Sequence, residues 1–86
     1  SVTNIKGIEV NQRLVDNANQ LLLPYRQRIN YEFFVFDGKD LPDSISNADY
    51  VFMIDVLHHV PEPEQEKFLN AVIEKMAAGS LLILKD

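Results

Sequence analysis

Polar side chains that could do chemistry gather directly after one apolar stretch of the chain. Residues 50–54 form an unbroken apolar run, and Asp55, His58 and His59 follow it before Pro61. An apolar run without polar alternation predicts a strand that is buried on both faces of a parallel sheet. Ligands of open α/β sheets bind outside the carboxyl ends of the strands, so this stretch predicts one wall of a site.

Three further strands are predicted around this central one. They cover residues 4–10, 31–36 and 81–84, and residues 41–47 form an irregular crossover. Gly7 lies inside the first strand, where a glycine suggests that another backbone or a ligand comes close. The order strand, helix, strand, crossover, strand, helix, strand predicts a layered α/β sheet of parallel strands joined by right-handed connections.

Two amphipathic helices are predicted between the strands. Asn11 can cap the first helix, which ends near Leu23 because Pro24 lacks an N–H donor. Pro63 opens the second helix, and Gly79 closes it in the C′ position. The side chains predicted to be buried are Leu14, Val15, Ala18, Leu21 and Leu22 in the first helix, and Phe68, Leu69, Val72, Ile73 and Met76 in the second.

The composition restricts the class of protein. The chain has 86 residues, room for one domain, and 13 acidic against 8 basic residues give a formal net charge of -5. Lys and Arg are scattered, so neither nucleic acid nor an anionic membrane is an expected partner. The lack of cysteine excludes disulfides and thiolate metal sites, and no apolar run is long enough to span a membrane. We expect a soluble, cytoplasmic domain.

Charged residues stand at the end of each predicted strand. Glu9 lies one place before the end of the first strand, and Asp37, Asp55 and Lys85-Asp86 follow the other three. Three carboxylates are therefore expected along one rim of the sheet. The sequence has no nucleophile elbow or zinc-type histidine pair, and its two adjacent histidines would point about 100° apart on a helix. Neither a hydrolase nor a metal site is expected.

In this order and spacing the segments resemble the class I S-adenosylmethionine-dependent methyltransferases. Gly7 to Asn11, with Glu9 at its centre, is similar to the segment where an acidic residue ends that family's second strand. The other similar segments are Phe36-Asp37-Gly38 with Leu41-Pro42 (third strand), Asp49 to Val51 with Asp55 to Pro61 (fourth strand) and Met76 to Ile83 (glycine turn and fifth strand). The resemblance implies a partial Rossmann-like domain over residues 1–86, with parallel strands and flanking helices.

The resemblance also implies S-adenosylmethionine as cofactor, a small-molecule methyl acceptor, and roles for single residues. Glu9 would accept hydrogen bonds from both ribose hydroxyls, and Val10 would lie against the adenine. Asp37 would accept a hydrogen bond from the adenine amino group, and the N–H of Gly38 would reach a ring nitrogen. The floor near the sulfonium and the acceptor would be lined by Asp55, Val56, Leu57 and His58, with His58 as a general base.

Each of these polar residues also has a purely structural interpretation. Glu9 can be a solvated residue beside a helix start, and Asp37-Gly38 is a common turn pair. Asp55 can cap the turn after its strand. His58 can pack at a strand end or face solvent.

One part of the family pattern is missing from the sequence. Gly7, Gly38 and Gly79 are the three glycines, and none forms the G-x-G cluster of the loop that holds the methionine part of the cofactor. The strand before that loop would lie between the first and third strands of this chain. Its absence predicts either two open inner strand edges or a repacked sheet. We therefore expect a fragment of a longer methyltransferase, or a product whose gap another chain fills.

Two functions follow from the sequence. The first is the adenosine-binding half of a methyltransferase that acts on a small molecule. The second is a non-catalytic remnant that self-associates through its unpaired strand edges, or that another chain completes. These motifs specify neither the methyl acceptor nor the oligomeric state.

Overall fold

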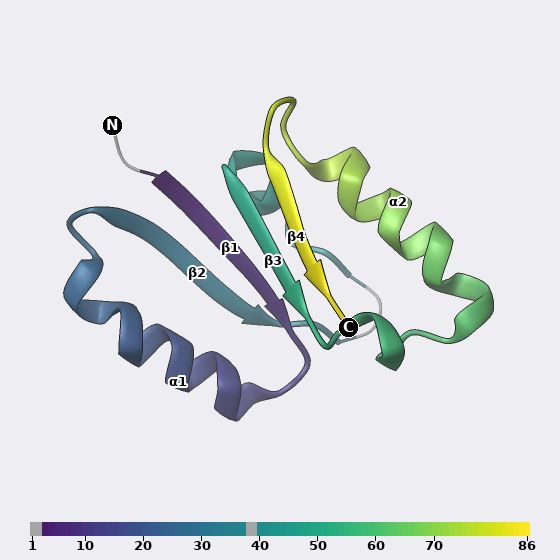
Figure 1. Cartoon of the computed structure of the whole chain (residues 1–86), viewed down its shortest axis with the longest axis horizontal. Coiled ribbons are helices and arrows are strands. Elements are labelled where there is room, and N and C mark those ends of the chain that lie inside the picture. Colours follow the sequence, from purple (N-terminus) through teal and green to yellow (C-terminus); the bar gives the residue numbers. More distant parts are fainter. Residues whose placement is uncertain (1–2, 38–39) are drawn as a thin grey trace.

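Four parallel strands form one sheet in the order β2-β1-β3-β4 (Figure 1). The computed structural model describes residues 3–37 and 40–86. The strands are β1 (Thr3–Glu9), β2 (Ile29–Val35), β3 (Tyr50–Ile54) and β4 (Leu81–Lys85). The predicted α/β class, with a parallel sheet and flanking helices of a partial Rossmann-like fold, is confirmed.

The sheet has no open inner edge between the strands that the structure describes. β1 pairs along its whole length with β2, and its residues Ile5–Ile8 pair directly with Tyr50–Met53 of β3. Of the two predicted alternatives, the structure therefore has the repacked sheet. The unpaired edges are the outer edges of β2 and β4.

The first helix follows the sequence signals closely. α1 (Gln12–Leu22) begins after Asn11, whose side-chain oxygen accepts hydrogen bonds from the N–H groups of Arg13 and Leu14 at 2.9 and 3.3 Å. This confirms the predicted cap, a type of interaction that contributes about 1 kcal/mol. Beyond Leu22 the chain tightens into the 3₁₀ helix η1 (Leu23–Tyr25), which contains Pro24.

The second helix is shorter than predicted at both ends. Residues Glu62–Glu64 form a separate 3₁₀ helix, η4, and α2 covers Gln65–Lys75. The prediction that Gly79 is the C′ residue is wrong, because the helix has ended before it. Gly79 instead has φ +87° and lies in a turn where the N–H of Ser80 donates to the carbonyl of Ala77 at 3.1 Å. A positive φ at the third position of a turn favours glycine.

The core lies on one face of the sheet. It joins Ile8, Val51 and Met53 of the strands to Val72 of α2 and to Ile45 of the 3₁₀ helix η2 (Asp43–Asn47). All five side chains are 2% exposed or less. The crossover between β2 and β3 thus helps to cover the same face as α2.

The other face is covered only over β1 and β2, where α1 packs (Figure 1). Side chains alternate along strands, and Tyr50 and Phe52 of β3 are in register with Leu81 and Ile83 of β4. Tyr50 is 37% exposed and Leu81 58%, while Phe52 and Ile83 are half-buried. The prediction that β3 is buried on both faces is therefore wrong for this face, because no described helix covers it there.

Part of the predicted apolar stripe of each helix is exposed to solvent, because no other described element covers it. Val15 of α1 and Val72 of α2 are buried, but Leu14, Leu21 and Ile73 are 53%, 74% and 55% exposed. None of the described helices is long and apolar enough to cross a membrane.

Gly7 allows a close contact between β1 and β2. A Cβ added to Gly7 would collide with ring atoms of Phe33, which is the neighbour of Gly7 in the β1–β2 register. The neighbour is therefore a side chain, and not the backbone or ligand that the sequence suggested. The ring fills the space in front of the glycine on the α1 face.

An exposed ion pair ties the crossover to α2. Nζ of Lys75 lies 2.9 Å from Oδ1 of Asp43. The hydrogen bond from Lys75, and then its positive charge, lower the pKa of Asp43 below the ordinary value of 3.8. Because both side chains reach solvent, the pair mainly orients the two segments.

We expect Gly7→Ala to lower the free energy of unfolding by about 1–3 kcal/mol, because the new methyl group overpacks against Phe33. Urea unfolding measures this loss. Phe33→Leu removes the obstructing ring, so the same glycine substitution should cost less in that background. An equal loss in both backgrounds would contradict the proposed contact.

We also expect the Asp43 carboxylate to titrate below 3.8 in the folded chain and to return to its ordinary pKa in Lys75→Met. Its favourable contribution is present above the unfolded-state pKa and is lost as the pH falls through the lower, folded value. Carbon-detected NMR titration of the carboxylate measures both pKa values. An unchanged Asp43 pKa in Lys75→Met would show that the ion pair is not populated in solution.

Candidate functional site

A groove lies at the carboxyl ends of β1 and β3. Its volume is about 520 Å³, and its lining residues are Glu9, Val10, Asn11, Gln12, Leu14, Asp55, His58 and His59. We call it the rim groove. Its size is within the range of small-molecule sites. It brings together the first and third of the strand ends that the sequence singled out.

An apolar hollow of about 240 Å³ adjoins the rim groove on the α1 face of the sheet. The two share Glu9, Leu14 and Asp55, and the hollow is otherwise lined by Gly7, Ile8, Val15, Ala18, Phe33, Phe52 and Ile54. An apolar body could therefore lie here while a polar group reaches the groove. Sequence reasoning did not predict this hollow, because it depends on the missing cover over Phe52 and Ile54.

Glu9 ends β1 and is held by its backbone. Its carbonyl accepts a hydrogen bond from the N–H of Phe36 at 2.6 Å, which fixes the strand end against the residue that follows β2. Among the described residues its carboxylate has no hydrogen-bond or ion-pair partner, and the residue is half-buried. An ionised carboxylate without a partner can accept hydrogen bonds from two hydroxyl groups of a ligand.

Asp55 turns the chain sharply at the end of β3. It has φ +56°, a left-handed conformation that aspartate adopts more readily than most residues. Its N–H donates to the carbonyl of Lys85 at 2.7 Å, so the turn is bonded to the end of β4. Backbone strain of this kind is common at ligand sites, where it typically costs about 1–3 kcal/mol.

His58 is paired with Asp86. The distance from Nδ1 of His58 to Oδ1 of Asp86 is 3.1 Å, and the backbone N–H of His58 donates to the same oxygen at 3.4 Å. Nothing in the sequence pattern indicated this pairing, because the two residues are 28 positions apart. With Asp55 they form an exposed cluster whose polar atoms lie within 4.8 Å of one another, and acidic groups are often this close without an ion.

His58 and His59 share the 3₁₀ helix η3 (Leu57–His59) and do not diverge as a regular helix would require. Their ring centroids are 4.2 Å apart, with 37° between the ring planes. The expectation that the two side chains point about 100° apart is therefore wrong. Both rings line the same groove.

The remaining predicted site residues lie elsewhere. Asp37 and Asp40 line a separate hollow. The side chain of Asp37 accepts a hydrogen bond from the backbone N–H of Asp40 at 3.0 Å. The side chain of Val56 is fully buried, so only its backbone could meet a ligand. Leu57 is half-buried, and its carbonyl accepts a hydrogen bond from Gln65 at 3.2 Å. Gly38 is outside the described residues.

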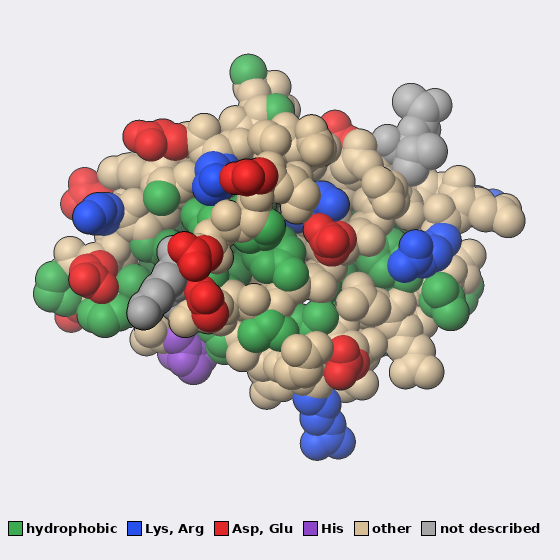
Figure 2. Space-filling view, turned by 180° about the vertical axis from the view of Figure 1, so that it is seen from behind, with side chains coloured by type: hydrophobic (Ala, Val, Ile, Leu, Met, Phe, Trp, Pro, Cys, Tyr) green, Lys and Arg blue, Asp and Glu red, His purple; other side chains and the backbone are tan. Residues whose placement is uncertain are grey.

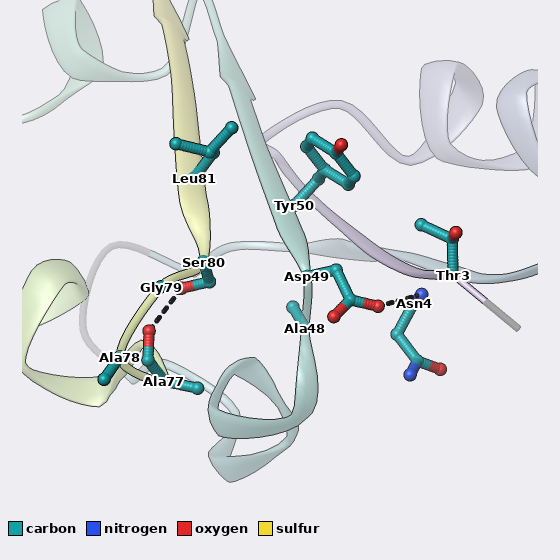
Figure 3. Close-up of a pocket in the computed structure, with 10 residues that line it drawn as sticks. All are labelled: Thr3, Asn4, Ala48, Asp49, Tyr50, Ala77, Ala78, Gly79, Ser80 and Leu81. Carbon is teal, nitrogen blue, oxygen red and sulfur yellow. Dashed lines mark hydrogen bonds between the residues drawn. The ribbon is translucent and has the colours of Figure 1, made fainter. Parts of the chain in front are cut away.

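A second large hollow, of about 530 Å³, lies at the opposite end of the sheet (Figure 3). The Asp49 carboxylate in its wall accepts the N–H of Asn4 at 2.7 Å, and the Ser80 hydroxyl donates to the carbonyl of Ala77 at 2.6 Å. These two side chains make hydrogen bonds within the chain, at the end of the sheet where β1, β3 and β4 begin. Ligands of parallel sheets bind at the carboxyl ends, so we assign the site to the rim groove.

The charge of the rim groove selects among ligands. Glu9 and Asp55 contribute two carboxylates, and the described residues of its lining include no Lys or Arg. Such a groove disfavours phosphate groups and favours a neutral or cationic ligand that offers hydroxyl donors. Away from the groove, the Lys and Arg side chains on the face in Figure 2 are scattered among acidic ones.

The side chains of the rim groove fit an adenosine group better than a complete S-adenosylmethionine molecule. Ribose offers two hydroxyl donors for the carboxylate of Glu9, which no other described residue engages, and Val10 supplies an apolar contact beside it. The sequence has no glycine cluster that could hold the amino-acid end of the molecule through backbone N–H groups.

A comparison with family models gives one match. The model described as "Methyltransferase domain" matches residues 1–79. No curated protein and no solved structure matches the chain.

Proposed function

Because the chain belongs to the methyltransferase domain family, we propose that its rim groove holds the adenosine half of S-adenosylmethionine during methyl transfer to a small molecule. The observation that carries this proposal is the carboxylate of Glu9 at the end of β1, which has no hydrogen-bond or ion-pair partner among the described residues. It lies in a groove of suitable volume, and among the described residues of its lining there is no Lys or Arg to attract phosphates.

Glu9 would bind both ribose hydroxyls. Hydrogen bonds to a charged acceptor contribute about 1.5–3 kcal/mol each, so this one side chain would supply much of the affinity for the nucleoside. Val10 would lie against the adenine, and Asp37 with Gly38 would contact its polar edge. The Asp37 contact requires adenine to extend from the rim groove toward the end of β2.

Asp55, the backbone of Val56, Leu57 and His58 would border the reacting atoms. The cofactor supplies an electrophilic methyl group, and the chain holds the acceptor in line with it at close range, which lowers the entropic part of the barrier. His58 would act as general base for an acceptor that must lose a proton. The methionine end would be held by residues outside this sequence.

We expect S-adenosylhomocysteine to bind the 86-residue chain saturably, and Glu9→Gln to weaken binding at least tenfold. The loss of a charged acceptor shared by two hydroxyls accounts for this magnitude, since 1.4 kcal/mol is a factor of ten. Isothermal titration calorimetry measures both affinities. Glu74→Gln on α2 makes the same charge change outside the rim groove and should bind like the parent chain. Equal affinity of all three would exclude Glu9 as the ribose ligand.

The uncovered half of the sheet supports a second candidate function. Tyr50, Phe52, Leu81 and Ile83 form an apolar strip on the face that no described helix covers. Parallel sheets are normally covered on both faces. A non-catalytic chain that self-associates, or that another chain completes, would bury this strip, and the free outer edge of β4 would offer hydrogen bonds to an added strand.

For this candidate we expect the sedimentation coefficient to rise with protein concentration, and Leu81→Glu to abolish the rise. A charge in the uncovered strip would have to be desolvated on association. Ile73→Glu is the matched control, because Ile73 is equally exposed (55% against 58%) but lies on α2. A monomer at every concentration, or equal effects of both substitutions, would contradict association through this face.

A further inference from the structure

The pairing of His58 with Asp86 has a consequence for the proton of the methyl acceptor, and this inference rests on the proposed function. The imidazole presents Nδ1 to Oδ1 of Asp86 at 3.1 Å. The same oxygen also accepts the backbone N–H of His58 at 3.4 Å, so the carboxylate is held against the backbone of the residue it orients. A carboxylate accepts but does not donate, which requires that Nδ1 carry the hydrogen.

That tautomer leaves Nε2 without a proton. The side chain of His58 is 54% exposed, and the residue lines the rim groove. Asp86 is 29% exposed in its side chain and is more enclosed than its partner. A histidine whose Nδ1 is held by a carboxylate, and whose Nε2 carries no proton, can act as a general base through Nε2.

We propose that Asp86 is a positioning residue that holds His58 with Nε2 free, and that the site serves acceptors whose nucleophilic atom is a hydroxyl on an apolar body, such as a phenol. The body would lie in the apolar hollow, which shares Glu9, Leu14 and Asp55 with the rim groove. The hydroxyl would donate its hydrogen to Nε2.

The proton balance follows directly. The O–H bond of the acceptor breaks as the O–CH₃ bond forms, and the proton passes to Nε2 of His58. The methyl group would come from the sulfonium of the cofactor, whose S–CH₃ bond would break with its electron pair remaining on the sulfur. The imidazolium that results is stabilised by Asp86, has the Asp55 carboxylate within 4.8 Å and the His59 ring beside it, shares the groove lining with Glu9, and returns the proton to water.

Nitrogen NMR of the histidine rings tests the position of the proton without any cofactor. At an alkaline pH of about 9, His58 should show a protonated Nδ1 and a bare Nε2. Asp86→Ala should move the hydrogen of His58 toward Nε2 and leave the His59 signals in place as an internal control. Glu66→Ala, which removes one carboxylate from α2, should change neither ring. A parent chain with the hydrogen on Nε2 of His58 would overturn the proposal.

The acceptor class is tested by adding phenol or its methyl ether, anisole, to the same sample. Phenol should shift the Nε2 signal of His58, whereas anisole, which has no hydroxyl hydrogen, should not. The phenol response should be lost in Asp86→Ala. Equal responses to both compounds, or no response to phenol, would overturn the acceptor class. Since neither compound needs the cofactor, these results stand apart from the binding of S-adenosylhomocysteine, whose failure would count against the proposed function alone.

Discussion

The direct ladder between β1 and β3 is the constraint on which the rest of the molecule depends. Ile5–Ile8 pair with Tyr50–Met53, and this places the ends of two strands that are about 45 residues apart in sequence beside each other. Glu9 and Asp55 therefore line one groove. The same ladder aligns Ile8 with Met53 on the core face and Gly7 with Phe52 on the face where the apolar hollow forms. The site and the thin core are two results of one pairing.

The sheet has one well-covered face and one face that is only half covered. On the side of α2, the side chains of Ile45, Val51, Met53 and Val72 exclude solvent completely. On the side of α1, cover ends beyond β1, and the apolar hollow lies where that cover stops. Methyl transfer and completion by another chain would both use this side, so the two candidate functions are alternatives for one region of the surface. They can be separated because Glu9 belongs to the groove and Leu81 to the uncovered strip.

Local signals in the sequence predict most of the elements. Asn11 marks a helix start because its short side chain caps two N–H groups, and the apolar run at residues 50–54 is a strand. The family pattern placed Glu9 and Asp55 at strand ends of the same sheet. By contrast, the sequence does not distinguish the two positions that Gly79 can take, because a glycine beyond an apolar helix is compatible with both a C′ residue and a later turn. Periodicity also predicted burial for Leu14, Leu21 and Ile73, since it shows which face is apolar but not whether another element covers it.

The features that the sequence does not predict are long-range. The contact between Gly7 and Phe33, the side-by-side rings of His58 and His59, and the approach of Asp86 to His58 all depend on how the strand ends meet.

The most direct test of the proposed site is amide NMR of the chain during titration with S-adenosylhomocysteine. We expect the shifted signals to cluster at residues 9–12, 37 and 55–59, around the rim groove and the end of β2. Shifts confined to residues 48–50 and 77–81, at the opposite end of the sheet, would contradict it.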